Sequence, residues 1–279
     1  MTPEEIQSII ANAIEQAQDQ EAAARFAADP HAPMITGLLH DFISSINPQL
    51  PNAIQTEEVN VFGLANNRLE PVDFNRRATF SKSGDVCVPR YCVGTGGFQV
   101  CFPPVDICAS GIAHATLDRL FGLSTLQITN IDVTNFSVNG NVLTATGKMT
   151  AMVIALSAGG HISASGGPPG ISIPVDASVS VVSWFPVAKG TATMTFNLDQ
   201  QKLTAMTLDA LKISQGRVEV HIKGLGPFSS IVDKLIEVIQ SFIALAINDD
   251  GISDKLKDVL QKQINLYVNS RGTAAGAGR

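Results

Sequence analysis

The segment 226-GPFSSIVDKLIEVIQSFIALAI-247 is apolar over more than half of its helical circumference. Its stripe consists of Phe228, Ile231, Val232, Leu235, Val238, Ile239, Phe242 and Ile243, widened by Ile236 and Leu245. Such a helix must be surrounded by protein or by lipid. Asp233, Lys234 and Glu237 lie near its centre, and each would cost roughly 2.5–3.5 kcal/mol in a lone membrane span. The segment therefore predicts a buried helix, which the rest of the chain has to cover.

Residues 126–224, which precede this segment, predict a β-sheet that could surround the helix. From Leu126 the apolar period changes from 3.6 to 2, and the dipeptide 139-NG-140 is a strong hairpin signal. We expect strands at 142–158 with a turn at Gly159-Gly160, at 161–166, 171–187, 190–199, 202–216 and 217–224. Most exceed the usual five or six residues. Long strands with bulges and glycines can curl far enough to enclose a helix.

Helices are expected at both ends of the chain. Residues 1–51 contain two apolar stripes at helical spacing, and a further amphipathic helix follows Ser253 up to residue 268. The stretch from Gly111 to Leu123 is mixed, and we expect a short helix or turn there. Helices segregated from an antiparallel sheet make an α+β domain. We expect one domain over 1–269, with the sheet at 126–224, the C-terminal helices at 226–268 and a disordered tail at 270–279.

Composition restricts the partners. The 279 residues carry a net charge of −6 with only 16% charged residues, and no basic stripe is present. Nucleic acid is therefore not an expected partner, because phosphate binding needs clustered Lys and Arg. The start, MTPEEIQSII, lacks the pattern of a secretory signal. Either the protein is cytosolic or its leader has been removed.

All four cysteines fall within 87–108, as Cys87, Cys92, Cys101 and Cys108. No C-x2-C pair is present, which argues against a zinc knuckle. Three disulfide connectivities are open, and we favour Cys92–Cys101 with Cys87–Cys108, because 94-GTGG-97 would turn a hairpin that brings each pair together. Two disulfides imply an oxidising compartment and hence secretion. The alternative is a surface loop with reduced thiols in a cytosolic protein.

Three stretches resemble the TULIP lipid-binding superfamily, in particular its single-domain branch of group 7 dust-mite allergens, takeout proteins and juvenile hormone-binding proteins. The stretch 2-TPEEIQSIIANAIEQA-17 is similar to the opening helix of the mite allergens. Residues 203–247 resemble the final strands of these allergens, which lead into the long buried helix. The stretch 253-SDKLKDVLQKQINLYV-268 resembles their closing helix. The resemblance implies a long amphipathic helix wrapped by a strongly curved antiparallel sheet, with a lipid-like ligand between the two. The cysteine hairpin insertion at 87–108 departs from that pattern.

The small residues of the strands add to this expectation. Inward Ala, Gly, Ser and Thr in 144–160 would leave unfilled apolar volume, and methionines adapt to an irregular guest. The alternative is that small residues let sheet and helix pack closely. The expected ligand contacts are Phe228, Ile231, Val232, Leu235, Ile239, Phe242, Ile243, Met149, Met152, Val153, Met194, Phe196 and Met206.

Catalytic and metal signatures are weak. The five histidines show no metal-like spacing, and Ser172 lacks the context of a nucleophile elbow. In 224-GLGPFS-229 the third glycine of a dinucleotide fingerprint is missing. We expect a secreted, non-enzymatic carrier of a hydrophobic small molecule (a fatty acid, terpenoid, sterol or carotenoid), with no cofactor. The alternative is a protein- or membrane-interaction module with a filled core; transient membrane contact and homo-oligomerisation stay open.

Overall fold

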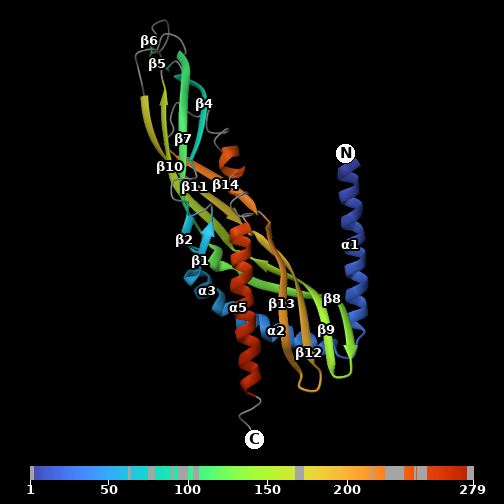
Figure 1. The fold of residues 1–279 in the computed structure, drawn as a ribbon. Helices are drawn as coiled ribbons and strands as arrows, with labels where there is room; N and C mark the ends of the chain where they lie inside the picture. Colours follow the sequence, from blue (N-terminus) through green and yellow to red (C-terminus); the bar gives the residue numbers. More distant parts are fainter. Residues whose placement is uncertain are drawn as a thin grey trace.

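The computed structural model describes residues 3–61, 64–74, 79–88, 91–93, 100–102, 107–166, 173–214, 216–223, 236–241, 243 and 250–274 (Figure 1). Its helices are α1 (Pro3–Ala27), α2 (Ala32–Ile46), α3 (Leu50–Thr56) and α5 (Asp250–Ala274), with 3-10 turns η1 (Asn47–Gln49) and η2 (Leu123–Thr125). Residues 236–241 and 243 are also helical. Pro3 opens α1, as expected for a residue whose missing N–H costs nothing in a first turn.

The strands before residue 122 are mostly short. They are β1 (Glu58–Val61), β2 (Leu64–Arg68), β3 (Val72–Asp73), β4 (Thr79–Val88), β5 (Tyr91–Val93), β6 (Val100–Phe102) and the long β7 (Ile107–Phe121). The later strands are all longer than six residues: β8 (Gln127–Asn139), β9 (Val142–Met152), β10 (Ala155–Gly166), β11 (Ile173–Trp184), β12 (Val187–Asn197), β13 (Lys202–Ser214) and β14 (Arg217–Lys223).

The long strands form two antiparallel sheets that share one strand order. The four-stranded sheet runs β13-β12-β9-β8, and the six-stranded sheet runs β14-β11-β10-β7-β3, with β4 also paired to β7. Each strand of the first sheet is next in the chain to the strand at the matching place of the second. The pairs are β13 with β14, β12 with β11, β9 with β10 and β8 with β7. The two sheets are therefore one meander of four long strands, bent once along a common line (Figure 1).

Two hydrogen bonds hold the bend between the two central strands. The Val153 N–H donates to the Pro186 carbonyl (2.9 Å), and the Phe185 N–H donates to the Ile154 carbonyl (3.1 Å). Gly122, at a φ of +108°, lies against the backbone of Ala155, where a Cβ atom would collide with the carbonyl. The bend thus depends on backbone contacts between neighbouring strands.

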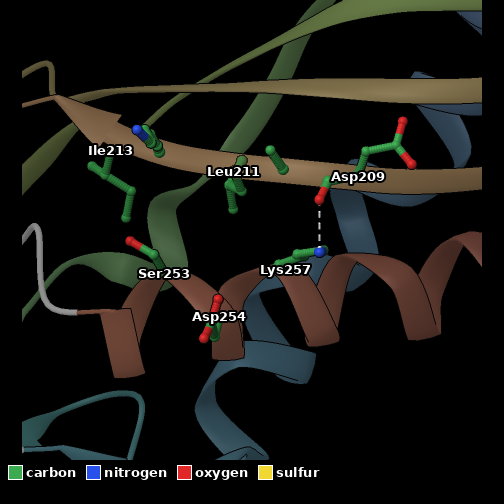
Figure 2. A pocket seen from close by; sticks show the side chains of 8 residues that line it. Asp209, Leu211, Ile213, Ser253, Asp254 and Lys257 are labelled. Atoms are coloured by element: carbon green, nitrogen blue, oxygen red, sulfur yellow. Dashed lines mark hydrogen bonds between the residues drawn. The ribbon is translucent and has the colours of Figure 1, made fainter.

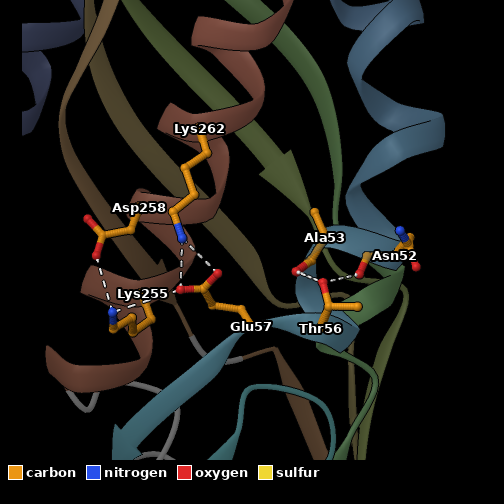
Figure 3. Close-up of polar contacts among 7 residues, drawn as sticks. All are labelled: Asn52, Ala53, Thr56, Glu57, Lys255, Asp258 and Lys262. Atoms are coloured by element: carbon orange, nitrogen blue, oxygen red, sulfur yellow. Dashed lines mark hydrogen bonds and ion pairs between the residues drawn. The ribbon is translucent and has the colours of Figure 1, made fainter.

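Helices cover the inner face and the outer strands of the four-stranded sheet. α5 packs along β13, and α1 lies beside β8 at the opposite edge (Figure 1). α2 contributes the buried residues Ile35, Leu39, Phe42 and Ile46 to the core. Figure 3 shows how α5 is fixed to the chain between α3 and β1: Lys262 Nζ lies 2.9 Å and Lys255 Nζ 3.9 Å from the Glu57 carboxylate.

The α+β class, the long curved antiparallel strands and the helices at both ends of the chain are confirmed. The hairpin at 139-NG-140 is also confirmed, since β8 and β9 pair from Asn139↔Val142 onward. Of the predicted helix 226–247, residues 226–235, 242 and 244–247 lie outside the described residues.

Three local predictions were wrong. Gly111 to Leu123 is mainly strand β7, because its inward residues are alanines and leucines that hide the alternation. The strand predicted over 142–158 breaks at Val153-Ile154, and Gly159-Gly160 lies inside β10. Helix α5 continues to Ala274 instead of leaving a tail from 270, because the Ser270 hydroxyl donates to the Tyr267 carbonyl and Arg271 pairs with Asp41 at 3.8 Å.

Candidate functional site

The predicted ligand residues of the sheet share its inner face. Met149, Met194, Phe196 and Met206 are buried, on β9, β12 and β13. Met194 lies directly opposite Met206 in the strand register. Since residues two apart on a strand share a face, their alternation with exposed polar residues places all four toward the core.

The remaining predicted contacts divide into two groups. Val153, at the bend, is buried, and Met152 beside it is half-buried. On the predicted central helix Ile239 and Ile243 are buried. The other five positions, Phe228, Ile231, Val232, Leu235 and Phe242, lie outside the described residues, so their contacts stay predictions.

Part of the volume over the small residues is already filled. A Cβ atom on Gly147 would lie 2.8 Å from the Met194 Cε atom and 3.3 Å from Ile131 Cγ2. Both neighbours are buried, so they occupy the space that the glycine leaves on the inner face. At Gly147 the small residue therefore lets neighbouring side chains pack closely, as the alternative interpretation of the small residues predicts.

An open apolar pocket lies nearby, between α1, α2 and β8. It has a volume of about 320 Å³. Its lining consists of Ala23, Phe26, Thr36, Leu39, His40, Ile43, Thr129, Asn130, Ile131, Asp132 and Val133. Ile131 is the register partner of Met149, so the pocket lies next to one of the predicted ligand contacts. Pockets that hold small molecules fall in a range of about 300–1,000 Å³ and are mostly apolar.

Two contacts attach α1 over this pocket. Lys148 Nζ on β9 lies 2.7 Å from Asp19 Oδ2. The Phe26 ring meets the Phe136 ring of β8 edge to face, with centroids 5.6 Å apart. The sequence analysis missed the pocket: it predicts two apolar helix faces within residues 1–51, but no local pattern shows which strand such a face meets.

Ser183 is a buried hydroxyl that has no hydrogen-bond partner among the residues that the structure describes. It lies on β11 opposite Leu156 of β10 and Val218 of β14. A buried hydroxyl left unpaired costs about 1–3 kcal/mol of folding free energy. Either Ser183 finds a partner in another state of the protein, such as a ligand-bound one, or it lowers the stability of the fold.

A second opening lies between β13 and the start of α5 (Figure 2). It measures about 440 Å³ and is lined by residues 209–213 together with Ser253, Asp254 and Lys257. The Lys257 ammonium donates to the Asp209 carbonyl at 2.8 Å. This opening is more polar than the pocket under α1 and suits an apolar guest less well.

The cysteine strands have the register that the favoured pairing requires. Cys87 of β4 lies opposite Cys108 of β7, and Cys92 of β5 lies opposite Cys101 of β6. Opposite residues of antiparallel strands have Cα atoms about 4.5–5.5 Å apart, within the range that a disulfide spans. The backbone therefore permits both predicted bonds.

The described residues also bear on other kinds of site. They contain no group of three or more His, Cys, Asp or Glu side chains arranged to hold a metal ion. Within the same ranges, no helix combines the length and hydrophobicity that a membrane crossing requires.

No protein-family model matches the chain, and no curated protein matches it. Among solved structures, it overlaps a lipopolysaccharide binding protein at a TM-score of 0.33 and 11% identity, covering 82% of this chain. The chain spans 38% of that protein's length. It also overlaps Takeout 1 of Epiphyas postvittana at a TM-score of 0.25 and 11% identity, over 81% of this chain and 89% of the other. At these TM-scores neither overlap supports an argument about the family of this chain or assigns a role to a residue.

Proposed function

We propose that this protein binds a hydrophobic small molecule, such as a fatty acid, terpenoid, sterol or carotenoid, and acts by sequestration without catalysis. The observation that carries the proposal is the pocket of about 320 Å³ between α1, α2 and β8. Its apolar walls come from Phe26, Leu39, Ile43 and Ile131. Each methylene group that moves from water into such a site contributes about 0.8 kcal/mol, so a chain of modest length binds without any charged anchor.

The polar part of the ligand has several candidate partners. His40, Thr36 and Asn130 line the same pocket and carry hydrogen-bonding side chains. A longer ligand that follows the inner face from Ile131 past Met149 toward the bend would also approach β11, where Ser183 is buried and unpaired. A ligand carboxyl or hydroxyl group would satisfy that serine.

Helix α1 would act as the movable cover. Among the side chains that the structure describes, its contacts with the sheet include the half-exposed ion pair Asp19–Lys148 and the aromatic contact Phe26–Phe136. Exposed ion pairs contribute little, at most about 1 kcal/mol. An ion pair of this kind can break for ligand entry without unfolding the sheet.

Secretion and two disulfides complete the proposal. The opposed registers of Cys87 with Cys108 and of Cys92 with Cys101 support this pairing. Disulfides persist in oxidising compartments, which favours an extracellular carrier. Intact mass measured before and after reduction tests this: two disulfides predict a gain of about 4 Da, one hydrogen per sulfur. No gain would leave the protein with reduced thiols.

Solvent extraction of natively purified protein, followed by mass spectrometry, tests the carrier function. Recovery of a stoichiometric apolar molecule is expected. If no such molecule is recovered and a fluorescent fatty acid does not bind, the carrier function is wrong.

The filled space over Gly147 favours one other function, an interaction module whose core holds no ligand. Under that alternative the extraction yields nothing, and light scattering shows a stable complex with itself or with a partner.

A further inference from the structure

Four large apolar side chains are exposed where the long strands bend. The exposed fractions are 43% for Phe121, 47% for Ile154, 40% for Trp184 and 56% for Phe185. We call these four residues the bend patch. Trp184 is the single tryptophan of the chain. Exposed tryptophan and phenylalanine side chains that gather at one place usually mark an interaction surface.

The strand registers place two residues of the bend patch, Phe121 and Trp184, on one side of the sheet. Phe121 lies opposite Ser157, which lies opposite Val182, and Trp184 follows Val182 by two residues. Residues two apart on a strand share a face, so Phe121 and Trp184 are on the same side of the sheet. Phe185 lies beside Ile154 through their backbone hydrogen bond, and the Trp184 and Phe185 ring centroids are 6.3 Å apart.

Phe185 is held in an unfavourable backbone conformation. Its φ is +52°, in the left-handed region that bulky residues seldom adopt. Asn or Gly would adopt this φ at a lower cost. An exposed aromatic side chain at a strained position contributes nothing evident to the core, which points to a use outside it.

A groove with paired charges adjoins the bend patch and shares Phe121 with it. Its volume is about 710 Å³, and Gly159 and Gly160 lie in its lining. An ion pair lines it, with Arg119 Nε 3.3 Å from Asp73 Oδ2, and His161 Nε2 lies 3.7 Å from Asp118 Oδ2, a contact that becomes an ion pair only when the imidazole is protonated.

The charges on the opposite flank of the bend patch are also paired. Arg217, the register partner of Trp184, has its Nε 3.2 Å from Glu219 Oε1. The two flanks of the patch described above therefore carry charges of both signs side by side.

We propose that the bend patch docks on the surface of a neutral, zwitterionic lipid bilayer. Trp184 and the phenylalanines would enter the interfacial zone, where aromatic rings are favoured because one end is apolar and the other is wet. The paired charges of the groove match a surface of phosphate and ammonium groups. Attraction to an anionic membrane needs exposed Lys and Arg clusters, and the net charge of −6 opposes it.

Trp184 reports the docking directly, because the chain has no other tryptophan. The full-length protein is mixed with extruded phosphatidylcholine vesicles and its emission is recorded. A blue shift is expected, together with quenching by phosphatidylcholine that carries brominated acyl chains. Phe185→Asn is expected to lower the vesicle partition coefficient roughly tenfold, since it removes a large apolar side chain and keeps the left-handed backbone.

Leu266→Ser is the matched control, because Leu266 is a comparably exposed apolar residue on α5, away from the bend. It is expected to leave partitioning unchanged. No binding to phosphatidylcholine, or equal binding by Phe185→Asn and wild type, would overturn the proposal. So would binding that requires anionic lipid and is lost in salt.

Self-association is the competing outcome. If light scattering without vesicles shows a dimer that Phe185→Asn dissociates, the patch meets a second copy and the membrane proposal is wrong. The proposal stands apart from the carrier function, because Phe185 does not line the pocket under α1. Binding of a fluorescent fatty acid by Phe185→Asn, measured in parallel, is expected to equal that of wild type.

Discussion

The side chain of Asn47 pairs with the backbone of Ile128 as a neighbouring strand would. Its Nδ2 donates to the Ile128 carbonyl at 2.9 Å, and its Oδ1 accepts from the Ile128 N–H at 2.9 Å. Ile128 belongs to β8, an edge strand of the four-stranded sheet. Gln261 of α5 does the same at the other edge, accepting from the Leu208 N–H at 2.8 Å and donating to the Met206 carbonyl at 3.0 Å. Amide side chains from flanking helical segments thus occupy backbone groups at both edges, which blocks pairing with another chain.

Asn47→Asp is expected to destabilise the protein by about 1–3 kcal/mol, because a carboxylate cannot donate to the Ile128 carbonyl and is placed against it. Urea unfolding followed by circular dichroism measures the change. The control is Asn52→Asp on the exposed surface of α3, expected within about 0.5 kcal/mol of wild type. Equal effects of the two substitutions would show that the amide contact is unimportant.

Glu57→Gln is expected to lower the free energy of unfolding more than the substitution of an exposed carboxylate. The Glu57 side chain is mostly buried and faces the ammonium groups of Lys255 and Lys262. A neutral amide would remove the countercharge that Lys262 contacts and leave Lys255 with Asp258, 3.6 Å away, at a cost of about 1–2 kcal/mol. Glu58→Gln, next in sequence, is the control. Thermal unfolding distinguishes the two, and the destabilisation should shrink in high salt.

Ser183→Ala is expected to raise the unfolding free energy of ligand-free protein by about 1 kcal/mol, because it removes a buried hydroxyl that has no partner. The same variant should bind a fluorescent fatty acid less tightly if the serine receives the polar group of the ligand. Lower stability of the ligand-free variant would mean that the hydroxyl has a partner after all. Unchanged affinity would remove Ser183 from the ligand site.

Burial raises the pKa of Tyr267, and Asp41 raises it further, while Arg271 acts in the opposite direction. The Arg271 guanidinium lies 5.1 Å from the ring centroid. Since the folded state favours the neutral phenol, its contribution to stability is complete below the ordinary tyrosine pKa of about 10 and is lost as the pH rises through the raised value. Tyr267→Phe should therefore lose less stability than wild type as the pH rises above about 10, as chemical denaturation at each pH will show. Parallel losses would contradict the assignment.

The sequence predicts the residues of the inner face better than their surroundings. Met149, Met194 and Met206 were expected to point inward, and all are buried, because strand alternation fixes the side of a residue without reference to distant parts of the chain. The break at Val153-Ile154 could not be predicted from 149-MTAMVIALSA-158, which has no Gly or Pro. It depends on the hydrogen bond from Val153 to Pro186, a residue on another strand.

The pocket was even harder to predict from the sequence, because it exists only through tertiary structure. Phe26 and Ile131 are about a hundred positions apart in the printed sequence, and each looks like an ordinary core residue within its own element. Only the placement of α1 beside β8 brings them to one pocket. Strand β7 was missed for a different reason: its inward residues include Ala113 and Ala115, while Ile112 and Phe121 face solvent, so hydrophobicity does not follow burial there.

A pair of substitutions on α1 tests the carrier function most directly. Ala23 lines the pocket, whereas Ala24, the next residue of the helix, does not, and both alanines are exposed. Ala23→Trp should fill the pocket and weaken binding of a fluorescent fatty acid by tenfold or more, roughly the loss expected when a few methylene groups are excluded. Ala24→Trp, with the same change in size and helix propensity, should bind as wild type does. If both variants bind the fatty acid with wild-type affinity, or if wild type does not bind it, the pocket between α1, α2 and β8 is not the ligand site.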